Sequence, residues 1–571
     1  MSKRFLCLYT FRQSERKFSL SYGGNAPVLV RVVPIWHSTC ISRVMASRRF
    51  TEQLYFSLAV ALSRFAFRSH ALYDLDSVNF ALGMTRFDPR THQPHPPGYF
   101  LYITLGQMVN SVVHDANLAL VLLSIVASCG TVVLVYQLAL DWYGVPEARF
   151  ASLIFLFSPL GWFHGTVALT YGVEAFFSAL VGYLCWQIEE GRFRHILEAA
   201  IVLGLSAGVR PSSLLLLAPI LVYSARRTSG KLRAIGGVAL VVTVLAWAAP
   251  MLLAAGGIRV YLDALLSLWR LVPGRDTIFN SSPGTSIARA VTVAFIVLLL
   301  FGSACLALPS ASRTSDPSSG KKWRFTIVWI SPALCFYVFI FLKFVNSGYL
   351  LLLIAPGCLW LGRGLAEWFL EGKGSRRTKM AVIAAGALVN ASVYLASPFY
   401  CSYRSVRGFE AELAEVVSAT RRLGAPANTL IIGFDSHFLG YRHAGYYLPD
   451  YRTVEFPQVE LTEGTRTFTM QNGDTTLGAG VSAVGVTRFL LFPLPAGDAA
   501  SSDYIKSVEK LLPAKDLNVV HLGMHDYVSG PVSDLVLLFP ASEAAGKGVY
   551  PPLHPDSPDV NRREHFAISA R

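Results

Sequence analysis

Seven ionisable side chains crowd residues 72–99, between two apolar stretches of the chain. They are Asp74, Asp76, Arg86, Asp88, Arg90, His92 and His95. Ionisable groups at a membrane boundary are costly unless they are solvated or used in function. The density of such groups in a single loop therefore predicts a functional site, and we expect His92 and His95 to contact substrate there.

Asp74 and Asp76 are separated by one residue, so their carboxylates can lie near one ligand. They either hold a divalent cation or provide a general base. The alternative is a solvated loop in which Asp76 caps a short helix over residues 77–83. Further along, Gln93-Pro-His95-Pro-Pro-Gly98 forms a stiff turn that fixes the position of His95.

The composition around this loop is that of a membrane protein. Of 571 residues, 53% are hydrophobic and 15% are charged, whereas soluble domains carry roughly a quarter of their residues as charges. This balance excludes an ordinary soluble enzyme, a disordered tail protein and a coiled coil. The net charge of +14 is expected from Lys and Arg in cytoplasmic loops, so we assign no nucleic-acid partner. The cysteines show no spacing typical of a zinc site.

Apolar stretches that approach or reach the roughly 20 residues needed to span a bilayer begin at residue 54. The eleven stretches are 54–70, 116–142, 149–165, 171–188, 195–208, 212–224, 232–255, 287–308, 325–342, 349–369 and 380–396. They predict an all-α polytopic membrane domain over residues 54–397, with about eleven transmembrane helices.

The basic loops give this domain an orientation. Alternate threading of eleven spans places the clusters 48–49, 192–194, 226–233, 321–324 and 376–379 on one side. That side is the cytoplasm by the positive-inside rule, so the Asp76 loop and everything after Ser397 lie outside. Residues 1–53 carry nine Lys and Arg against two Glu, and we expect a poorly ordered basic arm with no assigned function.

Residues 398–571 differ from the spans, because charges return and short β-type runs alternate with helical patterns. We expect strands over 429–433, 488–492 and 535–539 and helices over 409–422 and 502–512. The pattern predicts a small extracytoplasmic α/β domain with a flexible tail. It contains no dinucleotide-binding or P-loop glycine pattern.

Polar residues elsewhere extend the candidate site. Arg210, in an external hairpin, either meets an anion such as a lipid phosphate or extends to the headgroups. Glu174, near the outer end of a span, either lines a cavity beside Asp76 or pairs with a cation such as Arg64. Arg442 lies among tyrosines that suit a sugar or an acceptor, and it can approach a phosphate. Packing at a strand edge explains those tyrosines equally well.

The first loop resembles that of the C-type (GT-C), polyprenyl-phosphate-sugar-dependent glycosyltransferases, on Tyr73-Asp-Leu-Asp-Ser-Val-Asn-Phe80 and His95-Pro-Pro-Gly-Tyr99. It is similar to the bacterial relatives of the protein O-mannosyltransferases and of the aminoarabinose transferase, in glycosyltransferase family 39. The resemblance implies a catalytic carboxylate at Asp76. Ser77 stands where the superfamily usually has Glu, and Asp74 is the acidic residue that compensates.

A second segment, Lys343-Phe-Val-Asn-Ser-Gly-Tyr349-Leu-Leu followed by Pro356, resembles a superfamily motif of a polar residue, then Tyr-Leu-Leu and Pro. The resemblance implies that Lys343 and Tyr349 contact substrate. Lys343 is then either a second phosphate ligand or a simple anchor at the membrane interface.

Together these features predict an inverting transfer of a sugar from a polyprenyl-phosphate donor to an acceptor hydroxyl on a glycan, a lipid or a protein. Asp76 takes the acceptor proton while Arg210 and Lys343 stabilise the departing phosphate. A divalent cation on Asp74 and Asp76 is the one cofactor that the sequence allows. We expect an integral protein of a prokaryotic inner membrane. The alternative is a polytopic transporter or lipid flippase, which predicts two related halves that the sequence does not show.

Overall fold

The computed structural model describes residues 35–271, 283–307, 319–339, 344–434 and 436–456, and then 459–462, 467–472, 475–476, 481–482, 485–493 and 518–531. The chain divides into two compact units, Met1–Glu52 and Gln53–Arg571. Most of the predicted basic arm, the side chain of Lys343, the helix expected over 502–512 and the strand expected over 535–539 lie outside the described residues.

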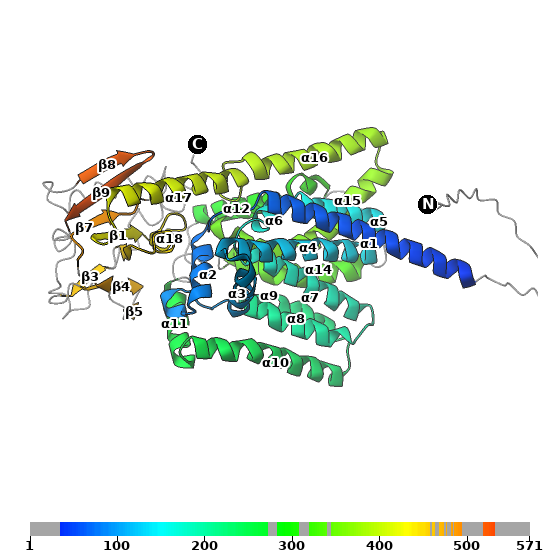
Figure 1. Ribbon diagram of the computed structural model, residues 1–571. Helices are drawn as coiled ribbons and strands as arrows, with labels where there is room; N and C mark the ends of the chain where they lie inside the picture. Colours follow the sequence, from blue (N-terminus) through cyan, green and yellow to red (C-terminus); the bar gives the residue numbers. More distant parts are fainter. Residues whose placement is uncertain are drawn as a thin grey trace, which may run out of the picture. The chain divides into compact units, whose positions relative to one another are not determined.

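The second unit contains a bundle of helices (Figure 1). The long helices, in chain order, are α1 (Ile35–Ala66), α4 (Ala116–Trp142), α5 (Val145–Leu156), α7 (Tyr171–Glu189), α8 (His195–Val209), α9 (Ser212–Ala225), α10 (Gly230–Ala254), α12 (Pro283–Phe301), α14 (Ser319–Phe339), α15 (Ile354–Glu371) and α16 (Arg376–Ala396). Shorter helices lie in or beside the loops: α2 (Leu75–Thr85), η1 (Pro89–Thr91), α3 (Phe100–Val113), α6 (Pro159–His164), α11 (Ile258–Leu271), η3 (Gly302–Ala307) and η4 (Phe344–Leu353).

Each of the eleven predicted spans contains helix in its described part. Within the described residues, the helical stretches Ala116–Trp142, Gly230–Ala254, Ser347–Glu371 and Arg376–Ala396 are long and apolar enough to cross a membrane. Shorter apolar helices accompany them at Phe100–Val113, His195–Val209, Ser212–Ala225 and Ala290–Leu306. The chain is therefore a multi-pass membrane protein, while the number of eleven spans stays a prediction.

One predicted span, 149–165, is not a continuous helix. It is broken between α5 and α6, where Ser158 precedes Pro159. Pro159 has no N–H to continue the α5 hydrogen bonds, and the Ser158 hydroxyl accepts from the Gly161 N–H at 3.1 Å as the cap of α6. The break directs the chain towards the loop that contains Thr170 and leads into α7.

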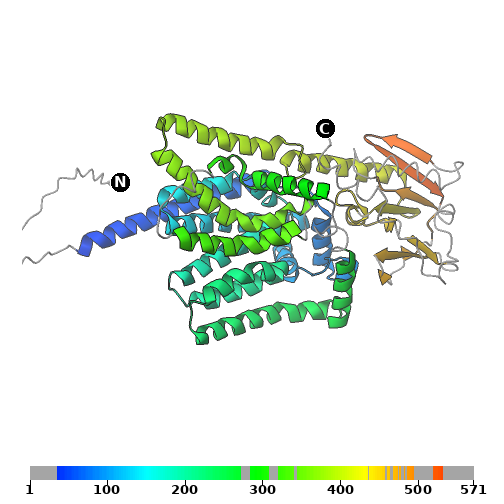
Figure 2. The ribbon, with the colours of Figure 1, turned by 180° about the vertical axis from the view of Figure 1, so that it is seen from behind.

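The helices differ in how much of their surface is covered. Side chains of α4 and α15 are largely buried, whereas α10 and α16 are mostly exposed and lie at opposite edges of the bundle in both views (Figures 1 and 2). Their exposed side chains are apolar, for example Val238 at 64% and Leu388 at 69% exposure. An apolar surface of this kind is suited to lipid contact.

The two ends of the bundle have different chemistry. At one end, Lys321 pairs with Glu190 at 2.7 Å and Lys322 donates to the Trp142 carbonyl at 2.7 Å. At the other end of α4, Asn117 donates to the Ser69 carbonyl at 2.9 Å, next to the first loop. The basic cluster 321–324 and the first loop therefore lie at opposite ends of α4, while the orientation of the bundle stays a prediction.

The C-terminal region forms a mixed sheet, as predicted for an α/β domain. Its strands β1 (Thr429–Phe434), β2 (Arg452–Phe456), β7 (Arg488–Leu491), β8 (Asn518–Leu522) and β9 (His525–Pro531) have the order β2-β1-β7-β9-β8. β1 is parallel to β2 and β7, and β9 is antiparallel to β7 and β8. A second, antiparallel sheet contains β3 (Val459–Thr462), β4 (Thr467–Asn472), β5 (Thr475–Thr476) and β6 (Val481–Ser482). The strands predicted at 429–433 and 488–492 are confirmed.

Helix α17 (Tyr403–Leu423) follows α16 after a short connection and covers the predicted helix 409–422. Its apolar residues recur every three or four positions, which gives it one buried face. At its C-terminal end Ala419 packs with Leu490 and Tyr527 of the sheet. The seven-residue helix α18 (Tyr441–Tyr447) follows β1 and contacts α2 of the first loop.

Several hydrogen bonds join the first loop to the C-terminal region from residue 398 onward, the predicted outer domain. Leu72 N–H donates to the Tyr447 hydroxyl at 2.8 Å, the Tyr73 hydroxyl donates to the Tyr400 carbonyl at 2.8 Å, and Leu75 N–H donates to the His437 carbonyl at 2.9 Å. Backbone groups of a loop need such partners when they are buried. The outer domain therefore helps to hold the loop that carries Asp76.

Candidate functional site

The two aspartates of the first loop have different structural roles. Asp74 is the N-cap of α2, and its Oδ1 accepts from the Asp76 N–H at 2.9 Å. The cap is therefore Asp74, not Asp76 as the alternative interpretation of the sequence had it. Burial and the neighbouring charge of Asp76 raise the pKa of Asp74 to about 6. The Asp76 side chain remains 32% exposed, so its carboxylate is open to a substrate.

His95 connects Asp76 to Tyr99. Its Nδ1 lies 3.4 Å from Asp76 Oδ1, and its Nε2 lies 3.0 Å from the Tyr99 hydroxyl. Burial lowers the pKa of His95, and the charges of Arg210 and Arg442 lower it further, although Asp76 acts in the opposite direction. His95 is therefore a neutral imidazole near pH 7, held between an acidic and a phenolic side chain.

The proline-rich turn that positions His95 is packed from both sides. Gly98 has φ +104°, and a side chain there would meet Met251 at 3.1 Å. The Tyr261 hydroxyl of α11 donates to the Pro97 carbonyl at 3.1 Å. These contacts confirm that the turn is fixed in place, and they identify α11 as a support for it.

His92 also lies in this loop, with φ 55° in the left-handed region. Its ring centroid is 6.4 Å from that of His95. Burial lowers the pKa of His92 to about 3, with Arg442 and His95 acting in the same direction. The other charged residues of the loop pair among themselves, since Arg90 lies 2.9 Å from Asp88.

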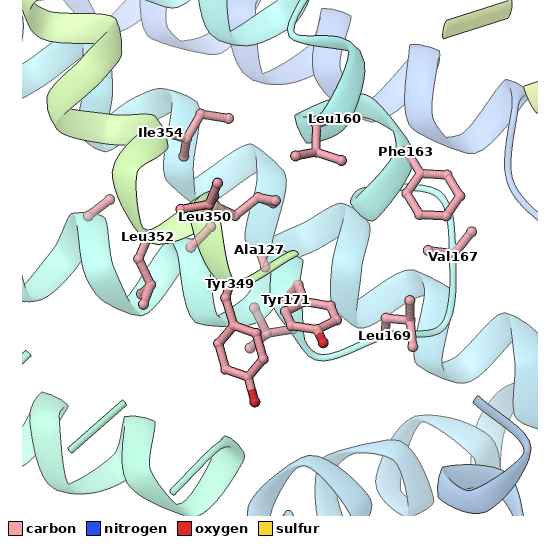
Figure 3. Packing of buried hydrophobic residues seen from close by; sticks show 14 of the residues in the cluster. Ala127, Leu160, Phe163, Val167, Leu169, Tyr171, Tyr349, Leu350, Leu352 and Ile354 are labelled. Carbon is pink, nitrogen blue, oxygen red and sulfur yellow. The ribbon is translucent and has the colours of Figure 1, made fainter. Parts of the chain in front are cut away.

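Arg210 is buried at the external end of α8, enclosed by aromatic rings. Its guanidinium carbon lies 4.1 Å from the ring centre of Tyr171, 4.2 Å from that of Tyr349 and 5.8 Å from that of Tyr99. Figure 3 shows Tyr171 and Tyr349 side by side, and their ring centroids lie 5.5 Å apart. Tyr349 therefore lies against Arg210, and its contact with substrate stays a prediction.

Two polar groups hold the Arg210 guanidinium. Nη1 donates to the Thr170 hydroxyl at 2.7 Å, and Nε lies 3.5 Å from Glu174 Oε2. Glu174 also accepts from the Ser213 hydroxyl at 2.7 Å. Glu174 thus pairs with Arg210 and not with Arg64, which donates to the Leu156 carbonyl and lies 4.9 Å from the Trp162 ring centre.

Arg442 approaches the first loop from the outer domain. It is 6% exposed, and its guanidinium carbon lies 4.9 Å from the ring centre of Tyr441. Its Nη2 is buried and has no hydrogen-bond partner. Its charge acts on both His92 and His95, so it lies close to the histidine side of the Asp76 site.

The sequence missed several members of this site. Tyr171 lies one turn of α7 before Glu174, so a search for aromatic residues at helical spacing would have indicated it. Tyr99 follows His95 by four residues at the end of the proline-rich turn, outside any helix. His164 is fully buried beside Tyr171, and neither ring nitrogen has a hydrogen-bond partner. Its position at the end of a broken span gave no such signal.

A metal site at Asp74 and Asp76 finds little support in the geometry. Asp74 Oδ1 is engaged in the helix cap. Within the described residues, no group of three or more His, Cys, Asp or Glu side chains is arranged to hold an ion. We therefore derive no step that uses a metal. The two aspartates are better described as a cap and an open carboxylate.

A known protein family and solved structures show similarity to this chain. Residues 90–232 match the family described as protein O-mannosyl-transferase TMEM260 N-terminal domain. Apo ArnT from Cupriavidus metallidurans is similar in structure, with a TM-score of 0.50 and 13% identity over 85% of this chain and 98% of that chain. The chain has the GT-C fold of ArnT, and residues 90–232 are similar to the O-mannosyl-transferase domain. The predicted resemblance to these glycosyltransferases is thereby confirmed.

Two further solved structures show weaker similarity. ArnT from Cupriavidus metallidurans bound to undecaprenyl phosphate has a TM-score of 0.48 and 12% identity, over 84% of this chain and 97% of that one. The archaeal oligosaccharyltransferase AglB from Archaeoglobus fulgidus, in complex with an inhibitory peptide and a dolichol-phosphate, has a TM-score of 0.41 and 11% identity, over 83% and 74%. No curated protein sequence matches the chain. The family match contains His95, Glu174 and Arg210, whereas Asp76, Tyr349 and Arg442 lie outside it.

Proposed function

We propose that this protein moves a sugar from a polyprenyl-phosphate donor to an acceptor hydroxyl, with inversion at the anomeric carbon and with Asp76 as the base. The observation that carries the proposal is the state of Asp76. Its carboxylate is partly exposed and lies beside a buried neutral histidine, at the end of a membrane bundle. A general base must be within hydrogen-bond reach of the proton that it takes, and an open carboxylate meets this requirement.

His95 orients the base in this proposal. Its Nδ1 lies 3.4 Å from Asp76 Oδ1, and its Nε2 forms a hydrogen bond with the Tyr99 hydroxyl at 3.0 Å. Because no hydrogen bond from His95 occupies the Asp76 carboxylate, its lone pairs are free for the acceptor hydroxyl. The proton then passes from the acceptor to Asp76 as the acceptor oxygen attacks the anomeric carbon.

Arg210 receives the charge that develops on the departing lipid phosphate. Its guanidinium is already fixed by Thr170, Glu174 and two tyrosine rings, so little reorganisation accompanies the reaction. Tyr349 belongs to the same wall and contacts the donor. Lys343, whose side chain lies outside the described residues, is proposed as a second phosphate ligand. The polyprenyl tail lies between spans, where the apolar surface of the bundle accepts it.

We further propose that the reaction takes place on the outer face of a prokaryotic inner membrane. The opposite placement of the basic cluster 321–324 and the first loop supports this orientation, because the basic clusters mark the cytoplasmic side. A protease or a membrane-impermeant label that reaches the outer domain only after permeabilisation would contradict the orientation.

The test of the reaction uses the purified full-length protein in liposomes with a lipid extract that contains radiolabelled polyprenyl-phosphate sugars. We expect the label to move from the lipid to an acceptor with an inverted anomeric configuration, read by NMR of the product. Retention of configuration would contradict a single displacement with Asp76 as the base. Transfer from a soluble nucleotide sugar in the absence of lipid donor would contradict the donor assignment.

A further inference from the structure

Arg442 differs from the other buried arginines of the bundle in its partners. Arg210 has Glu174 at 3.5 Å, Arg363 has Glu367 at 2.8 Å, and Arg64 donates to two backbone carbonyls. Each of these four arginines has one buried nitrogen without a hydrogen-bond partner, which is Nη2 in Arg442. Arg442 differs because no described Asp or Glu lies within 4.0 Å of its guanidinium, and no described backbone carbonyl accepts a hydrogen bond from it. A buried charge without a counter-charge is strongly unfavourable.

The described residues around Arg442 do not supply a negative charge. Its own helix, α18, contributes Tyr441, over whose ring the guanidinium lies. The first loop contributes His92 and His95, which burial keeps in their neutral forms. Asp76 is the partly exposed acidic residue of the site, and its carboxylate lies 3.4 Å from His95 Nδ1. An anion that entered between these groups would meet a free guanidinium edge without a competing carboxylate on it.

We propose that Arg442, together with His92, forms an anion-binding subsite for a phosphate or carboxylate of the acceptor, on the outer-domain side of Asp76. The inference rests on the proposed glycosyl transfer and specifies its acceptor as an anionic molecule that carries the reacting hydroxyl. Arg442 is a specificity-determining residue in this account. It fixes one end of the acceptor while Asp76 takes the proton at the other.

The position of the two arginines distinguishes acceptor from donor. Arg210 belongs to the end of a membrane helix and lies among the spans, where a lipid tail can extend. Arg442 belongs to the outer domain, behind a loop that is hydrogen-bonded to that domain through His437 and Tyr447. A guanidinium binds a phosphate or carboxylate through paired, charge-assisted hydrogen bonds, so a free edge suits such a group.

The first experiment measures anion binding without any transfer reaction. The purified full-length protein in detergent is titrated with sodium phosphate, against sodium chloride at equal ionic strength, and its thermal unfolding midpoint is recorded. We expect a saturable rise for the wild type and an apparent Kd at least about tenfold higher for Arg442→Gln. Arg442→Lys keeps the charge and should retain part of the effect. Arg404→Gln, an exposed arginine on α17, is the matched control and should bind phosphate as the wild type does.

The second experiment measures transfer to a matched pair of acceptors, an octyl glycoside and the same glycoside bearing a phosphate ester. Arg442→Gln should raise KM for the phosphorylated acceptor by about tenfold and leave KM for the donor lipid unchanged. A rise in the donor KM instead would place the anion on the donor and overturn the proposal.

The two experiments separate this proposal from the proposed function. If phosphate binding depends on Arg442 but the protein transfers no sugar, the anion subsite is supported and the proposed glycosyl transfer is contradicted. If the wild type transfers sugar, but neither Arg442→Gln nor Arg442→Lys changes phosphate binding or the acceptor KM, the anion subsite alone is contradicted.

Discussion

The site has two walls, one formed by the membrane helices and one by the outer domain, and they differ in the partners that they provide for a buried arginine. On the membrane wall, Arg210 is enclosed by tyrosines and has Glu174 as its counter-charge. On the outer-domain wall, Arg442 is buried to a similar extent, yet no described acidic residue forms an ion pair with it. Both arginines have one buried nitrogen without a hydrogen-bond partner, so the difference between the walls is the counter-charge. This difference teaches that burial of an arginine does not by itself identify a binding residue, whereas burial without a described counter-charge points to one.

The largest effect that tests this difference is expected from Arg210→Gln. Removal of one partner of a buried ion pair costs about 3–5 kcal/mol, because the other charge remains buried. We therefore expect a large fall in the unfolding midpoint of Arg210→Gln and a smaller one for Arg210→Gln combined with Glu174→Gln. Arg442→Gln should unfold at or above the wild-type midpoint, since it removes an unpaired charge. Thermal unfolding in detergent checks all three variants, and equal losses for the two arginines would remove the contrast between the walls.

A smaller effect, on the rate of transfer, is expected from His95→Ala, because His95 lies beside Asp76. The substitution removes the group that lies 3.4 Å from Asp76 Oδ1. We expect the rate of transfer to fall by roughly 10–100-fold, with an unchanged KM for the donor, since Arg210 is untouched. His92→Ala is the control on the same loop and should leave this rate nearly unchanged with uncharged acceptors. Steady-state kinetics with varied donor separates the two parameters, and a rise in donor KM alone would mean that His95 binds the donor.

The smallest effect is the pH dependence of stability that Asp74 contributes. Its pKa in the folded protein is raised from 3.8 to about 6, so its stabilising contribution is present below about pH 4 and is lost as pH rises through 6. Asn at this position keeps an oxygen that accepts from the Asp76 N–H. We expect Asp74→Asn to be more stable than the wild type at pH 8 by about 1–3 kcal/mol and equal to it near pH 4. Thermal unfolding across this range is the measurement, and an Asp74→Asn variant that is less stable at pH 8 would contradict the buried-cap assignment.

The sequence predicted much of the fold because the relevant signals are local. The apolar spans, the return of charged residues after residue 397 and the strands at 429–433 and 488–492 can all be recognised from short stretches of residues. The break in the span 149–165 also has a local signal, because Ser158 and Pro159 form a helix start. We predicted a continuous span because the residues around them are apolar.

The pairing within the site was less predictable, because it depends on contacts between distant segments. Glu174 was considered with Arg64, yet its partner is Arg210, brought there by the packing of α7 against α8 and α9. Asp74 and Asp76 are the same residue type and lie two positions apart, so the sequence alone does not show which of them caps the helix. The Asp74 cap is accompanied by a hydrogen bond from Leu75 to His437 in the outer domain, and nothing in the first loop indicates that contact.

The central claim is that Asp76, and not its neighbour Asp74, removes the acceptor proton. Single-turnover transfer from radiolabelled donor lipid should be measured for Asp76→Asn and Asp74→Asn in the same liposomes. The account predicts a loss of about 10²–10⁴-fold for Asp76→Asn, with folding intact, and a rate close to wild type for Asp74→Asn. A near-normal rate for Asp76→Asn, or an equal loss in both variants, would contradict it.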